Sequence, residues 1–236
     1  MRRILLGSLA SILLVTSARG AEEGWIKQSD EGGVTIYNRE KTGSAIKEVK
    51  AIGVINAPPH ACFNVVLDMA HFKDFMPYTK RSDIVGQEGE RVLYSYQHLA
   101  LPLISDRDYT LKVVDVTPQA APGQEPAYYK KTWTQANARG PKPRDGVERV
   151  EVNDGFWRFD PIDGGTRTRA TYYVFTDPGG MIPSWVANQA NTQAIPNLFK
   201  ALGTQSQKPA YQTRRHVAPA APAAPASAPF APQGGG

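Results

Sequence analysis

The chain has 236 residues with 27 Lys or Arg and 22 Asp or Glu, so its formal net charge at pH 7 is +5. Six of the basic residues fall within or at the border of the two end segments described below, which leaves the middle of the chain close to neutral. A nearly neutral middle argues against a nucleic-acid partner. The single cysteine, Cys62, excludes an internal disulfide and is expected to be a small buried apolar side chain.

The first segment, residues 1–20, has the order of residue types that is typical of a secretory signal peptide. Two arginines precede an apolar run over 4–15, and small residues lead to Gly20. This run is shorter than the roughly 20 residues of a membrane-spanning helix, although a retained membrane anchor is the alternative. The sequence therefore predicts an exported protein, either periplasmic or secreted.

The last segment, residues 209–236, consists mostly of Ala, Pro and Gly. Such a composition buries little apolar surface and favours an extended, solvated backbone, so we expect a disordered tail. A spacer or a cell-envelope tether is its alternative role. Residues 22–208 remain between the two ends, and this is enough for one domain with a large core.

The predicted elements of this domain begin with two strands, over 34–37 and 44–56. Two prolines stop the second strand and open a helix over 60–70, in which Phe63, Val66, Leu67 and Ala70 recur at helical spacing. Strand-like segments separated by turn signals follow, and successive hairpins without helices predict an antiparallel sheet. These segments are 82–85, 92–99, 107–116, 128–134, 147–152, 155–161 and 167–176.

Residues 183–202 return to helical spacing, and Pro196 within them predicts a kink or a break. The order of elements predicts an α+β fold, in which a curved antiparallel sheet wraps around a long C-terminal helix. One helix cannot fill the inward face of so large a sheet with side chains. The packing therefore predicts an internal apolar cavity.

Three segments carry a resemblance to a known family. Residues 53–59 read Gly-Val-Ile-Asn-Ala-Pro-Pro, residues 105–109 read Ser-Asp-Arg-Asp-Tyr, and residues 176–188 read Thr-Asp-Pro-Gly-Gly-Met-Ile-Pro-Ser-Trp-Val-Ala-Asn. They resemble, in turn, the strand-to-helix transition, a Ser-x-Arg-Asp-Tyr strand and the start of the last helix in the START family. START stands for the steroidogenic-acute-regulatory-related lipid transfer domain, which belongs to the helix-grip superfamily.

The resemblance implies a helix-grip fold, non-covalent binding of one lipid or sterol in the cavity, and no cofactor. It also implies a mobile lid made of the C-terminal helix and a loop between strands. The chain departs from the family pattern at 118–126 and 136–145, where Pro and Gly are frequent. These loops are expected to reshape the cavity mouth.

Strand alternation and the stripe of the last helix select the candidate ligand-binding residues. The apolar face of the strand at 107–116 should point into the cavity and carry Arg107 with it, and a buried arginine needs polar partners. We expect either a structural salt bridge to a neighbouring strand or a polar anchor for the ligand. The two adjacent glycines at 179 and 180 form the expected hinge of the lid. The candidate ligand-binding residues are Arg107, Tyr109, Leu111, Trp185, Gln189, Thr192 and Phe199.

The sequence has no motif of known catalytic or metal-binding spacing. No two of the four histidines are three to five residues apart, and there is neither a Gly-x-Ser-x-Gly motif nor a phosphate-binding glycine loop. We therefore expect neither a metal site nor enzyme activity. With the resemblance to the START family, the expectation is a monomer that binds or transfers one lipid or sterol-like molecule and touches membranes transiently.

Two other functions stay open on the same fold. One is an enzyme, such as a cyclase or hydrolase acting on an apolar substrate, and a cluster of His with Asp or Tyr in the cavity would favour it. The other is an envelope interaction protein with a vestigial cavity, which side chains filling that cavity would favour.

Overall fold

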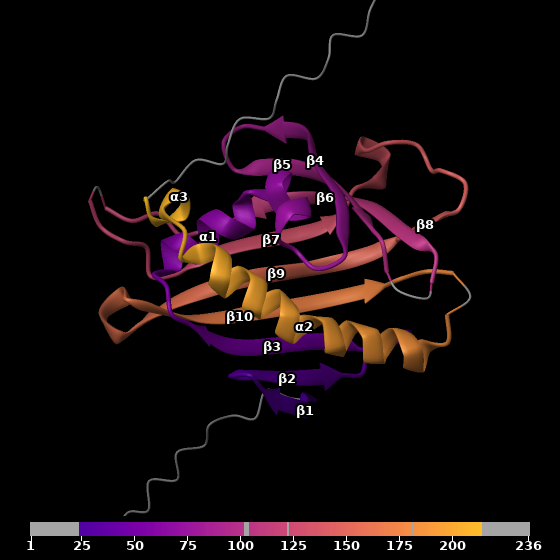
Figure 1. Cartoon of the computed structure of the whole chain (residues 1–236), viewed down its shortest axis with the longest axis horizontal. Helices are drawn as coiled ribbons and strands as arrows, with labels where there is room; N and C mark the ends of the chain where they lie inside the picture. Colours follow the sequence, from indigo (N-terminus) through magenta and orange to yellow (C-terminus); the bar gives the residue numbers. More distant parts are fainter. Residues whose placement is uncertain (1–23, 102–103, 122, 181, 214–236) are drawn as a thin grey trace, which may run out of the picture.

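The computed structural model describes residues 24–101, 104–121, 123–180 and 182–213 (Figure 1). The expected signal peptide, residues 1–20, lies outside these residues, as does the tail from 214 onward. The first part of the expected tail is described and differs from the expectation. A short helix, α3 (Pro209–Gln212), follows the domain there, and Tyr211 is buried.

A 10-stranded sheet forms the main layer of the described residues, in the order β1-β2-β3-β10-β9-β7-β6-β5-β4 with β8 beside β6. All neighbours are antiparallel, as expected, except the short strand β8, which pairs parallel with β6. The strands are β1 (Ile26–Glu31), β2 (Val34–Arg39), β3 (Glu48–Ile55), β4 (Thr79–Glu88), β5 (Val92–Leu99), β6 (Asp106–Asp115), β7 (Tyr129–Gln135), β8 (Val147–Arg149), β9 (Val152–Ile162) and β10 (Arg167–Asp177).

The long helix α2 (Ser184–Ser206) lies across one face of this sheet, with α1 (Pro59–Leu67) beside its C-terminal half (Figure 1). The helix continues through Pro196, so the expected break does not occur. Three 3₁₀ turns complete the described elements: η1 (Met69–Asp74), η2 (Asn137–Arg139) and η3 (Asp163–Gly165). The curved antiparallel sheet and the C-terminal helix confirm the predicted α+β helix-grip fold.

Gly53 of β3 lies directly under Phe199 of α2, where the helix packs on the sheet. A Cβ atom at this position would lie 2.9 Å from two ring carbons of Phe199, and Phe199 is only 5% exposed. Real Cβ atoms do not approach carbon so closely, so only glycine admits the Phe199 ring here. Gly53 therefore sets the depth at which α2 packs.

Lys131 of β7 is a buried lysine, 3% exposed, that closes the end of α1. Its ammonium donates a hydrogen bond to the carbonyl of Val66 in the last turn of α1. A cation at a helix C-terminus interacts favourably with the helix dipole, but burial opposes the charge and lowers the pKa of Lys131 to about 7.

The lowered pKa of Lys131 predicts how the stability depends on pH. Between pH 7 and the ordinary value of 10.5, the unfolded chain binds more protons at this lysine than the folded protein does. The free energy of unfolding should therefore rise with pH across this window, and Lys131→Met should remove part of the rise, on the order of a few kcal/mol. Urea unfolding at several pH values measures it. Lys130→Met, a neighbouring lysine on the other face of β7, is the control that should keep the rise.

The close approach at Gly53 gives a second prediction. Gly53→Ala should lower the free energy of unfolding by about 1–3 kcal/mol, because the new methyl group displaces the Phe199 ring. Gly203→Ala on α2 is the matched control, since its Cβ would lie 3.9 Å from the Ile55 side chain and alanine favours a helix. Urea unfolding midpoints compare the two, and equal midpoints would show that α2 does not depend on Gly53.

Candidate functional site

The face of the sheet under α2 carries a chain of aromatic rings. The ring of Trp157 on β9 lies 5.2 Å from that of Phe199 on α2 and 4.6 Å from that of Tyr172 on β10. Trp133 on β7 stacks on Tyr172 at 5.9 Å. Phe199 thus points at the sheet as the sequence predicted, and the rings form a continuous apolar surface between sheet and helix.

Tyr109 of β6 brings a polar group to this inward face. Its hydroxyl donates to the side-chain oxygen of Gln97 on β5 at 3.0 Å. Burial raises the pKa of Tyr109 and that of Tyr172 well above the ordinary value, and the nearby Tyr109 raises the pKa of Tyr172 further. Leu111 follows two residues later on the same face and is buried. The two tyrosines therefore lie in one enclosed region of low polarity.

Arg107 is 3% exposed, which confirms the predicted burial. Its guanidinium donates through Nη1 to the carbonyl of Ser105 and through Nε to that of Pro178, 3.4 Å away. Among the residues that the structure describes it forms no ion pair, so the salt bridge to a neighbouring strand is not found there. Backbone carbonyls satisfy the buried cation, and they tie the start of β6 to the segment between β10 and α2.

The expected hinge lies at this same connection. Gly179 and Gly180 adopt φ values of +69° and +72°, which side chains rarely tolerate, and the Gly179 amide donates to Asp177 at 3.0 Å. A Cβ atom at Gly180 would lie 3.4 Å from Nη2 of Arg107. Arg107 therefore packs against the hinge, and movement of the hinge stays a prediction.

Trp185 does not point at the sheet, and this part of the prediction is wrong. The side chain is 68% exposed in the first turn of α2. Steps of four from Phe199 pass through Ile195 and Ala187, both buried, so the inward stripe misses position 185. Asn188 faces the protein instead, because its side chain accepts from the amide of Lys47 at 2.9 Å.

The two polar candidates on α2 differ in what the structure describes. The Thr192 hydroxyl donates to the carbonyl of Asn188 in the same helix at 3.0 Å, so it already has an acceptor. The side chain of Gln189 lies outside the described part of the molecule. Neither residue is placed against a ligand by these observations.

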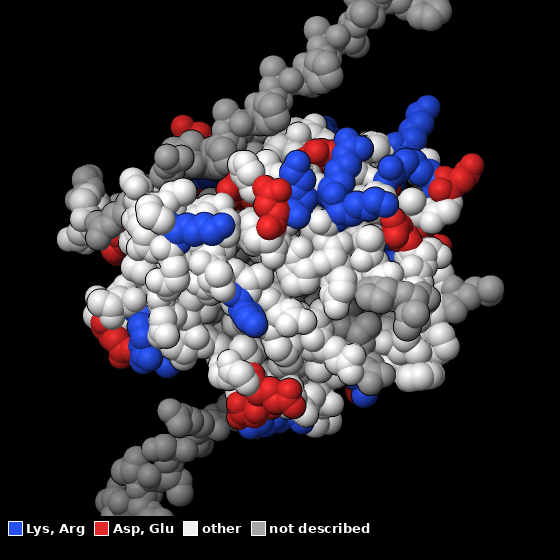
Figure 2. All heavy atoms as spheres, viewed as in Figure 1, with Lys and Arg blue, Asp and Glu red and all other residues white. Residues whose placement is uncertain are grey.

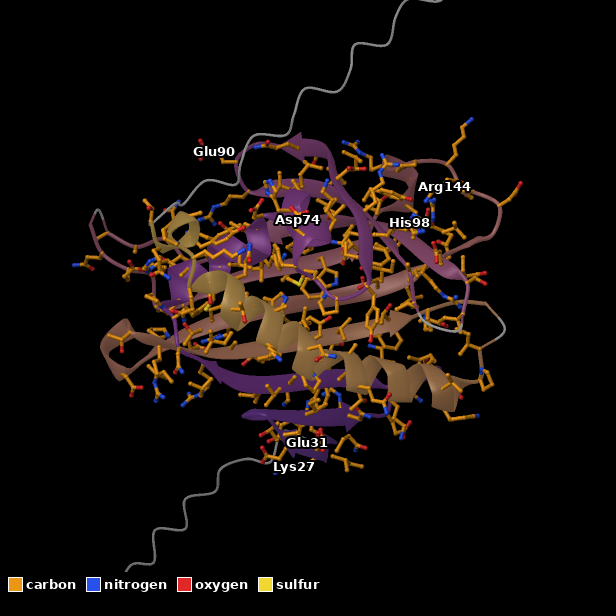
Figure 3. The ribbon with its side chains drawn as sticks, viewed as in Figure 1. Lys27, Glu31, Asp74, Glu90, His98 and Arg144 are labelled. Carbon is orange, nitrogen blue, oxygen red and sulfur yellow. The ribbon has the colours of Figure 1, made fainter. Side chains whose placement is uncertain are left out.

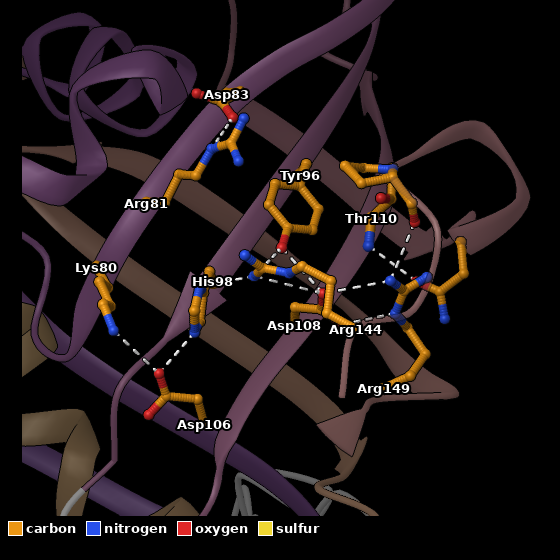
Figure 4. A network of polar contacts seen from close by, with 12 residues as sticks. Lys80, Arg81, Asp83, Tyr96, His98, Asp106, Asp108, Thr110, Arg144 and Arg149 are labelled. Atoms are coloured by element: carbon orange, nitrogen blue, oxygen red, sulfur yellow. Dashed lines mark hydrogen bonds and ion pairs between the residues drawn. The ribbon is translucent and has the colours of Figure 1, made fainter. Parts of the chain in front are cut away.

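A network of polar side chains lies on the other face of β5 and β6 (Figure 4). His98 bonds Asp106 through Nε2 at 2.7 Å and accepts from Arg144 at Nδ1 at 2.8 Å. Tyr96 also belongs to this network, and its hydroxyl donates to Asp108 at 2.9 Å. Burial is the main cause of the raised pKa of Tyr96. His98 and Arg144 lie together near the end of the sheet away from α3 (Figure 3).

This network holds the loop over residues 136–146 through Arg144, and both ring nitrogens of His98 already have partners in it. Arg149 pairs with Asp108 at 2.6 Å, and Asp108 is 1% exposed although strand alternation placed it away from the core. The loop over 136–146 covers it. Tyr96 and Gln97 are neighbours on β5 and point to opposite faces, so the network is separated from the inward face. An aspartate in the middle of a strand, Asp108, and the arginines of the 136–146 loop could have predicted this network from the sequence.

The described residues contain no group of three or more His, Cys, Asp or Glu that could hold a metal ion. None of the helices described is both long and apolar enough to cross a membrane. Burial raises the pKa of Cys62 to about 11, so this thiol stays protonated at neutral pH.

Comparisons with known proteins agree with this architecture. A family model described as polyketide cyclase / dehydrase and lipid transport matches residues 55–202. An uncharacterized protein of Pseudomonas aeruginosa is 28% identical over 210 residues, which are 88% of this chain and 100% of that protein. The phosphatidylcholine transfer protein of Mus musculus is 26% identical over 182 residues, or 75% of this chain and 80% of that protein.

Among solved structures, the STAR-related lipid transfer protein of Xanthomonas axonopodis is 25% identical with a TM-score of 0.68. The match covers 79% of this chain and 100% of the solved fragment. The family model spans more than half of the chain, and the curved sheet with its C-terminal helix agrees with it. The chain therefore belongs to the polyketide cyclase / dehydrase and lipid transport family and is a START domain protein with the helix-grip fold.

Proposed function

We propose that the protein binds one lipid or sterol-like molecule between the inward face of the sheet and α2 and carries it without changing it chemically. One observation carries this proposal. Tyr109 and Tyr172 lie on the sheet face that α2 covers, and both side chains are only half-buried there, although Tyr172 packs against the rings of Trp133 and Trp157. We infer that they line an internal space, in which the surrounding rings would contact acyl or sterol carbons.

Polar selectivity in this space would come from few groups. The Tyr172 hydroxyl has no hydrogen-bond partner among the described residues, and it lies on the face that α2 covers. Tyr109 and Gln97 form a second polar point there. An apolar pocket with these two polar groups suits a molecule with a long hydrocarbon part and one hydroxyl or headgroup. The hydroxyl or headgroup would hydrogen-bond them, because a buried polar atom needs a partner.

A carrier is favoured over an enzyme by the position of the polar network. Its His98, Asp106 and Tyr96 lie on the face opposite to Tyr109, and both ring nitrogens of His98 are already engaged. The inward face thus offers tyrosines and a glutamine but no histidine paired with an acid among the described residues. Names of the relatives support the same role, since two of those compared are called lipid transfer proteins.

The exposed Trp185 gives the carrier a place to touch membranes. It lies at the N-terminal end of α2, close in sequence to Gly179 and Gly180. Indole side chains favour the interface between lipid and water. The α2 face shows few charged side chains along its centre, whereas Lys and Arg gather over β4 and the loop before β8 (Figure 2). We infer transient membrane contact through α2 by a monomer that is exported to the periplasm or secreted.

Lipid extraction tests the carrier directly. The full chain, purified without detergent, should release one lipid class in organic solvent, near one molecule per protein by mass spectrometry. The emptied protein should take up a fluorescent phosphatidylcholine or a fluorescent sterol from vesicles. If neither probe binds and no lipid is extracted, the protein is not a lipid carrier. Conversion of a bound molecule into a product during incubation would point to the enzyme.

Tyr172 provides a prediction about selectivity. Tyr172→Phe should weaken binding of the preferred lipid by up to about ten-fold, because one hydrogen bond to the ligand is lost while the ring remains. Tyr173→Phe is the matched control. Its hydroxyl donates to Glu48 on the outward side, so its loss should leave lipid affinity unchanged. Fluorescent-lipid titration measures both variants, and equal affinities would remove Tyr172 from the site.

The lid gives a prediction about rate. Asn188 of α2 bonds the carbonyl of Ala45 at 3.3 Å, so Ala45→Cys with Asn188→Cys should allow a disulfide that ties the N-terminal half of α2 to the segment just before β3. Oxidation should slow lipid uptake by about ten-fold or more, and reduction should restore it. The buried Cys62 should not interfere. Uptake at an unchanged rate in the oxidised variant would show that α2 is not the gate.

A further inference from the structure

The sheet face opposite α2 contains a groove of about 660 Å³ over β3, β10, β9 and β7. Phe199 of α2 packs on Gly53, so the neighbouring Ile52 points away from the helix and into this groove. The groove is therefore separate from the proposed lipid site, with the thickness of the sheet between them. Its lining residues are Lys50, Ile52, Ala127, Lys130, Phe156, Arg158, Asp160, Pro161, Arg169 and Thr171.

Strand register brings cations together in the middle of this groove. Thr171 lies opposite Ile52 on one side and Arg158 on the other, and Arg158 lies opposite Lys130. These four residues thus form one row across four strands. Two like charges directly opposite each other on neighbouring strands are destabilising. Asp160 offsets the charge of Arg158, so Lys130 carries the positive charge of this row that no acid of the groove offsets.

Acidic partners are too few for the cations of the groove. Asp160 is the only acid in its lining, and it is bound by Arg158 through Nε at 3.0 Å and Nη2 at 2.7 Å. Arg169 lies opposite Asp160 in the register but forms no ion pair among the described residues. Lys130 likewise has no acid there and sits 4.6 Å from the centre of the Phe156 ring. Two cations remain to bind an external anion.

We propose that this groove binds a small ligand that carries a phosphate group on an apolar or aromatic body. Lys130 and Arg169 supply the charge, and guanidinium and ammonium groups are the usual partners of phosphate oxygens. Phe156, Ile52 and Pro161 supply an apolar wall for the rest of the ligand. The volume falls in the range of about 300–1,000 Å³ that is common for small-molecule sites. The phosphate belongs either to a molecule free in solution or to a lipid headgroup.

The test uses the full-length protein and two probes. Phenyl phosphate represents the free ligand, with phenol as its uncharged analogue. Vesicles of phosphatidylcholine with phosphatidylglycerol represent the headgroup, and vesicles of phosphatidylcholine alone serve as their control. Lys130→Gln with Arg169→Gln should weaken binding of the responding probe by about ten-fold or more. Lys27→Gln with Lys73→Gln removes the same charge at exposed positions outside the groove and should leave it unchanged.

Nuclear magnetic resonance and vesicle sedimentation read the outcome. A site for a free phosphate ester is supported if phenyl phosphate shifts the amide signals of β9 and β10. The shifts should be weak in the groove variant, Lys130→Gln with Arg169→Gln, and unchanged in the control variant. A lipid headgroup as the source is supported if the protein sediments with the vesicles that contain phosphatidylglycerol and not with those of phosphatidylcholine. The groove variant should then fail to sediment, whereas the control variant should still do so. Binding of neither probe, or equal weakening in the control variant, overturns the proposal. Both variants should still take up fluorescent lipid, so the result does not depend on the proposed carrier function.

Discussion

The pairing of β3 with β10 is the constraint on which the rest of the molecule depends. It joins a strand near the start of the domain to the last strand, with Ile55 opposite Thr168 and Val49 opposite Val174. This contact places the N-terminal hairpin beside the C-terminal one and makes a sheet wide enough to curve. Only then does α2, which follows β10, find Gly53 within reach and pack on it.

Strand alternation then gives the sheet two chemically different faces. Inward positions carry the aromatic rings of Trp133, Trp157 and Tyr172, whereas most of the charged side chains lie on outward positions (Figure 4). The outward face is not uniform. Over β5 and β6 the 136–146 loop and β8 cover it and pair its acids, as in the contacts of Arg144 and Arg149 with Asp108. Over β3, β10, β9 and β7 it is open and keeps cations that no described acid neutralises.

Arg107 ties the sheet to the segment between β10 and α2. Its hydrogen bonds to Ser105 and Pro178 hold the connection between β10 and α2, next to two glycines with positive φ. A backbone carbonyl is a good partner for a buried guanidinium because it leaves no second charge to desolvate. The proposed movement of α2 about Gly179 and Gly180 would have to break or carry along these contacts.

Much of the fold followed from local patterns in the sequence. Apolar alternation predicted the strands, helical spacing predicted α2, and the turn chemistry at Asp177 and Gly179 appears in the structure as a hydrogen bond and a positive φ. The burial of Arg107 and the inward direction of Phe199 were also predicted. Each of these depends on neighbours close in the chain, where spacing and side-chain shape suffice.

Other features were decided only by tertiary structure. Helical spacing placed Trp185 on the inward stripe, but the rotation of α2 about its axis is set by Phe199 against Gly53, and this turns Trp185 outward. Alternation along β6 puts Asp108 on the face away from α2, but Arg144 and Arg149, both distant in sequence, cover it and pair with it. The short strand β8 pairs parallel because β7 leaves the start of β6 without a partner. A local pattern states which side of an element is apolar; which distant segment meets that side depends on contacts that close only when the whole sheet forms.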